Sequence, residues 1–468
     1  MSLITSISGI RGTIGGKPGA GLSPIDVVKF TAAYGTWLHK RYPGLRCKVV
    51  VGRDARISGP MISGLVNSTL CSMGVDVIDA GLSTTPSVEM AVPFHSAQGG
   101  IILTASHNPK QWNALKLLNE KGEFISADDG AQLLDIASSG DFDFADVNHL
   151  GTIVADTGAI SRHIDAIIAL PLVDRDAITA ANFRVAVDAV NSSGGIAVPA
   201  LLKALGVKEI IELYCNPDGQ FAHNPEPLPE HLKDISREVV RKKAHLGLVV
   251  DPDVDRLAIV CEDGEMFGEE YTLVSVADYV LQYKKGNTVS NLSSTRALRD
   301  ITEKRGGTHA SAAVGEVNVV ELMKATNAVI GGEGNGGVIL PDLHYGRDAL
   351  AGIALFLSQL AKSGKTCSML RASFPDYFIS KNKIELTPDI DVQYILDRIA
   401  EKYKRQPMNT VDGVKIEFDR EWVHLRRSNT EPIIRIYSES RSMTTAENLA
   451  GKLIADIKDI ISELLTRA

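Results

Sequence analysis

A serine, a histidine and an asparagine stand directly after an apolar run of the chain. The run covers residues 99–103, and Ser106, His107 and Asn108 follow it in the segment Thr104-Ala105-Ser106-His107-Asn108-Pro109. A hydroxyl at the carboxyl end of a strand, beside hydrogen-bonding side chains, is where a nucleophile or a phosphate carrier would be presented. Taken alone, Ser106 also fits the N-cap of a helix, so the motif needs support from elsewhere in the chain.

Three aspartates at alternate positions follow a second apolar run, residues 246–250. Asp251, Asp253 and Asp255 repel one another and are hard to desolvate unless a cation lies between them. Oxygen ligands of this kind suit a hard divalent ion, and Mg²⁺ keeps open positions for a phosphate oxygen. The alternative is an acidic turn in solvent. The apolar residues 257–260 argue against it, because they return the chain to a sheet whose edge would carry the turn.

A third cluster, residues 426–435, is rich in arginine and hydroxyl side chains. Guanidinium groups bind phosphate as bidentate forks, and hydroxyl, amide and backbone N–H groups of a turn add further donors. Neighbouring strand residues face opposite sides of a sheet, so at least one of Arg426 and Arg427 is expected to be exposed. The three segments together predict a phosphate carrier, its metal and a clamp for a phosphate group.

With these residues in view, the chain resembles the α-D-phosphohexomutases, the family of phosphoglucomutases, phosphomannomutases and phosphoglucosamine mutases. The resemblance covers essentially all 468 residues, because family-like segments occur in the same order from Ser8-Gly9-Ile10-Arg11-Gly12 to the arginine cluster. Several such segments in order are far more specific than any one of them. The fold class that this implies is three successive related α/β domains with mixed sheets, followed by an α+β domain, around a central cleft.

The resemblance assigns a role to each segment. Ser106 matches the serine that the family carries as phosphoserine, Arg11 matches an arginine beside it, and His107 belongs to the same loop. Lys116, in Asn113-Ala114-Leu115-Lys116, matches a candidate proton-transfer lysine. The metal ligands are Ser106 through its phosphate, Asp251, Asp253 and Asp255. The substrate-binding residues are Arg256, Glu333, Asn335, Arg426, Ser428, Asn429, Thr430 and Arg435. Arg53 and Arg56 read either as surface ion pairs or, by family likeness, as residues that shape the cleft.

The chain departs from the family pattern in two loops. The sugar-reading loop, residues 332–337, has Asn335 where serine is common and Gly337 where histidine is common, so a potential acid/base group is missing. This form resembles the loop of archaeal-type phosphoglucosamine mutases. The phosphate loop has Arg427 where proline is usual and Asn429 where glycine is usual, and asparagine tolerates left-handed backbone geometry.

The resemblance implies an intramolecular phosphotransferase that interconverts hexose 6-phosphate and 1-phosphate. Ser106 would pass its phosphoryl group to the sugar, giving a hexose 1,6-bisphosphate intermediate, while Mg²⁺ neutralises charge on the transferring group. We expect Lys116 to transfer the proton, with its pKa lowered by cations such as Arg11. Glucosamine phosphate is the expected substrate. Mannose or glucose phosphate, a non-catalytic sugar-phosphate-binding paralogue and a phosphatase are the alternatives.

Composition limits the classes of partner. A net charge of −8 argues against nucleic acid and anionic membranes as partners, because both bind proteins through basic patches. The five cysteines lack zinc or disulfide spacing, and no apolar segment is long enough to span a bilayer. We therefore expect a cytoplasmic protein, a monomer or homodimer, whose partner is a small sugar phosphate.

The elements that must position these residues alternate between strand and helix. Strands are expected at residues 47–51, 75–79, 100–103, 183–187, 209–213, 246–250, 288–292 and 328–330, with helices at 58–73, 87–92, 195–205, from 231 and at 270–282. The last hundred residues instead suggest antiparallel strands at 414–418, 422–426 and 432–438 between helices at 391–404 and 444–465. The predicted domains are 1–155, 156–256, 257–368 and 369–468, bearing the phosphoserine, the metal, the sugar loop and the phosphate clamp.

Overall fold

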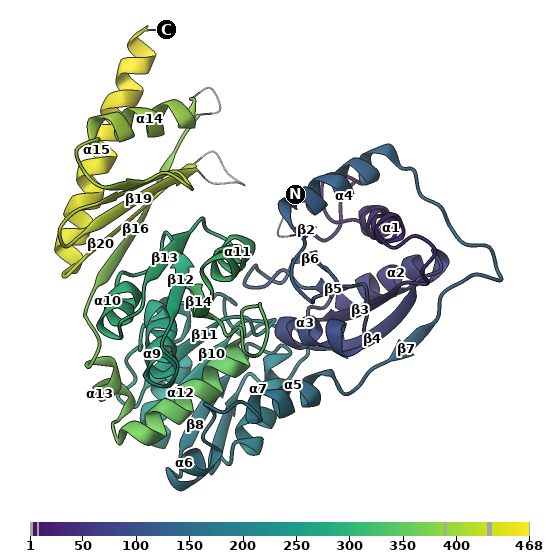
Figure 1. Ribbon diagram of the computed structural model, residues 1–468, viewed down its shortest axis with the longest axis horizontal. Helices are drawn as coiled ribbons and strands as arrows, with labels where there is room; N and C mark the ends of the chain where they lie inside the picture. The colour runs from purple at the N-terminus through teal and green to yellow at the C-terminus, as the bar shows by residue number, and fades with distance from the viewer. Residues whose placement is uncertain (1–2, 7–8, 388–389, 428–432, 468) are drawn as a thin grey trace.

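The computed structural model describes the chain apart from residues 1–2, 7–8, 388–389, 428–432 and 468. Its strands form four sheets that follow one another in chain order, and Figure 1 shows the first and fourth units at opposite ends of the molecule. Three mixed sheets precede an antiparallel one, which confirms the predicted α/β class with a C-terminal α+β unit.

The first sheet has the strand order β1-β2-β6-β5-β3-β4-β7. Its elements are β1 (Leu3–Ser6), β2 (Gly9–Thr13), α1 (Pro24–Arg41), β3 (Lys48–Arg53), α2 (Gly59–Ser72), β4 (Asp76–Leu82), α3 (Thr85–Phe94), β5 (Gly99–Leu103), β6 (Trp112–Leu118), α4 (Ala127–Ser139) and β7 (Ile153–Ala155). Helix α1 begins after Ser23, because Ser23 and Asp26 form a capping box and Pro24 is a favoured first helical residue.

The second sheet has the order β11-β10-β8-β9. Its unit contains α5 (Ala159–Ile168), α6 (Arg175–Ala180), β8 (Arg184–Asp188), α7 (Gly194–Ala204), β9 (Glu209–Leu213), a 3₁₀ turn (Pro229–His231), α8 (Lys233–Lys242), β10 (Leu246–Val250) and β11 (Leu257–Cys261). Every residue of β10 is buried, as its unbroken apolar run predicts for a central strand of a largely parallel sheet.

The third sheet has the order β13-β12-β14-β15. Its unit contains α9 (Glu269–Tyr283), β12 (Asn287–Asn291), α10 (Ala297–Lys304), β13 (His309–Ala312), α11 (Glu316–Thr326), β14 (Ala328–Glu333), β15 (Gly337–Ile339), α12 (Ala349–Ser363) and α13 (Cys367–Arg371).

The first three sheets share one arrangement. In each, two strands pair in parallel with a central strand, and an antiparallel strand follows on one side: β4-β3-β5-β6, β9-β8-β10-β11 and β13-β12-β14-β15. The turn into the antiparallel strand therefore leaves the same end of the same strand in every unit. These turns carry Ser106, the three aspartates and the sugar loop.

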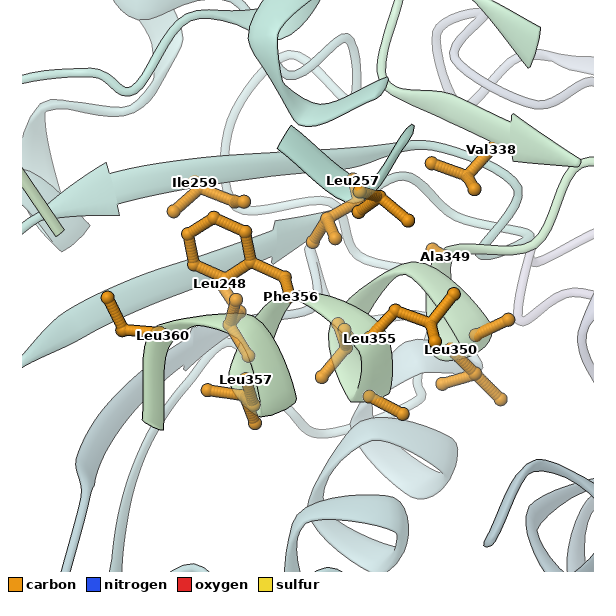
Figure 2. Close-up of a cluster of buried hydrophobic side chains, with 14 of the residues drawn as sticks. Leu248, Leu257, Ile259, Val338, Ala349, Leu350, Leu355, Phe356, Leu357 and Leu360 are labelled. Atoms are coloured by element: carbon orange, nitrogen blue, oxygen red, sulfur yellow. The ribbon is translucent and has the colours of Figure 1, made fainter. Parts of the chain in front are cut away.

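Helix α12 joins the second and third units through one core. Its residues are buried from Ala349 to Leu360, as expected of a helix that is apolar on every side. Figure 2 shows Phe356 beside Leu248 and Ile259 of the second sheet. One cluster of buried apolar side chains has members from Ile164 of the second unit to Phe374 after the third. Strand β11 also completes the second sheet beyond residue 256. The predicted domain limits at 155, 256 and 368 stay predictions.

The fourth sheet is antiparallel, with the order β16-β20-β19-β18-β17. Its elements are β16 (Phe378–Glu385), α14 (Val392–Lys402), β17 (Met408–Asn409), β18 (Val414–Glu417), β19 (Trp422–Arg427), β20 (Ile433–Ser440) and α15 (Met443–Arg467). Arg426 lies directly opposite Arg435, so both side chains leave the same face of the sheet. Arg427 is exposed, as the alternation of a strand predicts.

Two expectations about the whole chain can be compared with the structure. All five cysteines are free thiols in the structure. Within the part of the chain that the structure describes, no helix is both long and apolar enough to cross a membrane.

Candidate active site

Ser106 presents its hydroxyl to the aspartate turn of the second unit. Its Oγ donates a 2.7 Å hydrogen bond to Oδ2 of Asp251, 145 residues away in sequence. Ser106 has a left-handed backbone, with φ of 46°, and its N–H is held by the Thr104 hydroxyl. A non-glycine residue with this φ is uncommon and is often found at functional sites. The tertiary structure thus brings together the two segments that the sequence analysis paired.

Arg56 holds the loop that carries Ser106. Its side chain is fully buried, and its guanidinium donates to the carbonyl oxygens of Ser106, Asn108, Pro109 and Trp112 at 2.5–2.9 Å. Its Nε donates to Oδ2 of Asp54 at 3.0 Å. Arg56 is therefore no surface ion pair, and a rigid fork of five donors is what this set of acceptors requires.

We expect Arg56→Met to lower the free energy of unfolding by about 3–5 kcal/mol, because Asp54 and the loop carbonyls would stay buried without their cation. Arg46→Met is the control, since Arg46 forms a similar bidentate pair with Asp76 but its side chain is 50% exposed. That change should cost far less than Arg56→Met, because water screens an exposed ion pair. Urea denaturation of the two variants measures both values, and equal losses would contradict the role of Arg56.

The three aspartates form a tight turn between β10 and β11. Val254 has a left-handed φ of 64°, and Oδ1 of Asp251 accepts from the N–H groups of Asp255 and Arg256 at 3.2 Å each. All three carboxylates are 0% exposed. Burial, followed by the charges of Asp255 and Asp253, raises the pKa of Asp251 well above its ordinary value. The turn therefore brings together three buried carboxylates whose charged forms a bound cation would favour.

Two carboxylate oxygens of this turn fit a divalent cation. One ligand atom from each aspartate lies within 4.8 Å of the others. Oδ1 of Asp253 and Oδ1 of Asp255 are buried and accept no hydrogen bond among the described residues. Buried acceptors without a partner are costly, and a hard cation would satisfy both oxygens at once. The donor set consists only of oxygen, which suits Mg²⁺.

Lys116 of β6 lies against the same turn. Its Nζ donates to Oδ2 of Asp253 at 2.7 Å and lies 3.6 Å from Oδ2 of Asp255. Burial lowers the pKa of Lys116, but these two carboxylates more than offset the burial, so its pKa is raised. The prediction that neighbouring cations lower this pKa is therefore wrong. The carboxylates come from another unit of the fold, and the sequence does not show that they are the nearest charges.

Arg11, His107 and Arg256 surround this centre. Arg11 of β2 pairs with Ala114, which puts its side chain on the face of the sheet that Lys116 occupies. Nδ1 of His107 lies 3.4 Å from Oγ of Ser106. Burial, and then the charge of Arg256, lowers the pKa of His107 well below its ordinary value, so its imidazole is neutral. Nε of Arg256 is buried and has no hydrogen-bond partner among the residues that the structure describes.

The sugar loop is held by polar contacts at both ends. Oε1 of Glu333 accepts from Nδ2 of Asn291 at 2.8 Å and from the N–H of Gly315 at 3.1 Å. Its Oε2 accepts from Arg347 at 2.9 Å. Oδ1 of Asn335 accepts from the N–H of Gly337. Glu333 is thus fixed in position before any sugar binds.

The phosphate cluster is described in part. Ser428, Asn429 and Thr430 lie outside the described residues. Nε of Arg426 lies 3.2 Å from Oδ2 of Asp412, which also accepts from the N–H of Val314 at 3.0 Å. Val314 directly precedes the glycine that binds Glu333. Arg426 is therefore tied to the segment that supports the sugar loop.

Comparison with known proteins agrees with this geometry. Models of the phosphoglucomutase/phosphomannomutase α/β/α domains I, II and III match residues 3–144, 161–264 and 268–378, and the C-terminal domain model matches 387–455. The chain belongs to the phosphoglucomutase/phosphomannomutase family. It is a phosphohexomutase, since all four domain models match it in order and its relatives bear the names of such enzymes.

Individual relatives of this phosphohexomutase carry two kinds of name. A phosphoglucomutase/phosphomannomutase of Thermococcus kodakarensis is 38% identical, over 90% of this chain and 92% of its own. A probable phosphoglucosamine mutase of Methanopyrus kandleri is 32% identical over 98% of both chains. The crystal structure of a family protein from Burkholderia thailandensis has a TM-score of 0.83 and 26% identity, covering 97% of this chain and 98% of that one.

Three further residues of the phosphohexomutase site were missed from the sequence. Thr85 donates to Oδ2 of Asp253 at 2.6 Å. Arg347 contacts Glu333 and Asp255, and Glu316 contacts Arg347. The sequence gives Thr85 only a helix-start signal, Thr84-Thr85-Pro86, and Arg347 lies in a segment without regular structure.

Proposed function

We infer that this phosphohexomutase interconverts the 6-phosphate and 1-phosphate of glucosamine through a phosphorylated Ser106. The observation that carries the proposal is the hydrogen bond from Oγ of Ser106 to Asp251, inside a buried triad of carboxylates. A phosphoryl group on that oxygen would lie beside the two carboxylate oxygens that have no hydrogen-bond partner in the described structure. Asp251, Asp253 and Asp255 would hold Mg²⁺ there, which would neutralise charge on the transferring group.

The transfer step exchanges one phosphoester for another. The sugar hydroxyl attacks the phosphorus, the bond from phosphorus to Oγ of Ser106 breaks, and a sugar phosphoester forms. The proton of the sugar hydroxyl ends on Oγ of Ser106, which then donates to Asp251 as in the structure. Lys116 would relay this proton. Once Asp253 and Asp255 share their charge with a bound cation, they hold the ammonium proton less strongly.

The other residues would bind the two ends of the substrate. Arg426 and Arg435 share a face and would bind the phosphate that does not react, with Ser428, Asn429 and Thr430 of the same loop. Arg256 would bind a phosphate oxygen through its Nε, which has no hydrogen-bond partner in the described structure and lies 3.9 Å from Oδ1 of Asp255. Turning the hexose 1,6-bisphosphate intermediate over in this site returns the second phosphate to Ser106, and added bisphosphate would act as an activator.

The charge around the sugar loop supports an amino sugar. Glu333 shares the guanidinium of Arg347 with Asp255 and Glu316, so it is a carboxylate that Arg347 does not neutralise alone. An ammonium at C2 of glucosamine is favoured in such a place over a hydroxyl. The relative from Methanopyrus kandleri has a name that fits this substrate. The more similar Thermococcus kodakarensis relative has a name that fits glucose and mannose phosphates, which are the second candidates.

We expect kcat/KM for glucosamine 6-phosphate to exceed that for glucose and mannose 6-phosphates by about tenfold or more, because one added charge contact is worth about this much. Coupled assays of product formation with the three sugars measure the ratio. A preference for glucose or mannose would contradict the amino-sugar proposal. Release of inorganic phosphate from glucosamine 1-phosphate without formation of the 6-phosphate would instead indicate a phosphatase. A cytoplasmic location and a monomeric or homodimeric state stay predictions.

A further inference from the structure

Arg347 lies between the aspartate turn and the sugar loop. Its side chain is buried, with 8% of the residue exposed. Each guanidinium nitrogen donates to a different carboxylate: Nη2 to Asp255 at 2.6 Å, Nη1 to Glu333 at 2.9 Å and Nε to Glu316 at 3.0 Å. One side chain thus contacts a proposed metal ligand and the proposed sugar acceptor at the same time.

The backbone of Arg347 is fixed on both sides. Its own N–H donates to Oε1 of Glu316, and the N–H of Asp348 donates to the carbonyl of Val338 in β15. Asp348 also caps helix α12 through the N–H groups of Leu350 and Ala351. Hydrogen bonds on both sides therefore hold the backbone that carries the guanidinium.

Gly337 leaves the space that Arg347 fills. A Cβ atom at this glycine would lie 2.4 Å from Cδ of Arg347, much closer than real side-chain contacts allow. A side chain at residue 337 would therefore push the arginine away from its three carboxylates. Gly337 and Arg347 form a matched pair, in which the missing side chain of one admits the long side chain of the other.

We propose that Arg347 is a positioning residue that fixes Asp255 and Glu333 relative to each other, so that cation binding and sugar-phosphate binding both depend on one guanidinium. The proposal rests on the function proposed above for these two carboxylates. Lysine cannot replace the arginine, because its three N–H donors share one nitrogen, whereas Arg347 uses three separate nitrogens of a planar group. The conservative change Arg347→Lys keeps the positive charge and removes only the planar arrangement of three donor nitrogens.

The test measures binding as well as turnover. We expect Arg347→Lys to weaken Mn²⁺ binding, followed by calorimetry, by about tenfold or more, and glucosamine 6-phosphate binding by a similar factor. Gly337→Ala should produce the same paired loss. In the Arg347→Lys background it should add less than about twofold, because both changes release the same contacts. The matched control is Arg305→Lys, whose guanidinium pairs with Asp278 outside the site. This control should leave both affinities unchanged.

Two outcomes would overturn the proposal. One is a loss of only one of the two affinities in Arg347→Lys, and the other is unchanged binding in Gly337→Ala. A protein without mutase activity would refute the proposed function. In that case the calorimetric comparison of Mn²⁺ and sugar phosphate would still decide whether Arg347 links the two sites, so the two failures are distinguishable.

Discussion

Ser106→Ala is expected to lower mutase kcat by at least about 10³-fold, because it removes the hydroxyl that donates to Asp251 and is proposed to carry the phosphoryl group. Intact-mass measurement of the wild type after incubation with hexose 1,6-bisphosphate should show one phosphoryl group, and the variant should show none. The assay follows conversion of glucosamine 6-phosphate to the 1-phosphate. Normal turnover in the variant would place the carrier elsewhere in the chain.

A second variant separates chemistry from backbone strain. Ser106 has a left-handed φ of 46°, which glycine adopts more easily than alanine. Ser106→Gly should therefore be at least as stable to heat as Ser106→Ala and equally inactive. Ser72→Ala is the control for removal of a hydroxyl in the same unit, since the Ser72 hydroxyl donates to the carbonyl of Thr69 in its own helix. This control should retain wild-type turnover.

Asp253→Asn is expected to remove activity through loss of the metal. Oδ2 of Asp253 is held by Thr85 and Lys116, and its buried Oδ1 has no hydrogen-bond partner in the described part of the chain. An amide cannot supply the charge that a hard cation requires. We expect kcat to fall by at least about 10³-fold and Mg²⁺ affinity by at least about tenfold.

Stability gives an independent readout for this variant. Burial raises the pKa of Asp253, but the charge and hydrogen bond of Lys116 and the hydrogen bond of Thr85 more than offset this and lower it, so the folded protein favours the charged carboxylate. The Tm without Mg²⁺ should therefore fall, because buried Lys116 loses its nearest charge, and the rise in Tm on adding Mg²⁺ should be much smaller than in the wild type. Asp263→Asn, in an exposed turn, is the control and should behave as the wild type. Unchanged Mg²⁺ dependence in Asp253→Asn would contradict the assignment.

The sequence predicted the site residues that follow directly after a buried strand. Ser106 and Asp251 each follow an apolar run, and the shared arrangement of the sheets brings such ends together. Lys116 was misjudged, because its pKa depends on carboxylates from another unit. Arg347 was not detected, since nothing in its local segment shows that three distant carboxylates converge on it. Local sequence patterns indicate which polar side chains follow a strand, but not which of these side chains contact one another in the folded protein.

Helix α12 also affects how the chain folds during synthesis. Its apolar residues complete the core against β10 and β11, yet the ribosome makes them roughly a hundred residues later. Until then one apolar face of the nascent second sheet stays exposed to solvent, which favours aggregation. The emerging polypeptide must therefore wait for residue 363 before that sheet can close, and chaperone demand should peak in this interval.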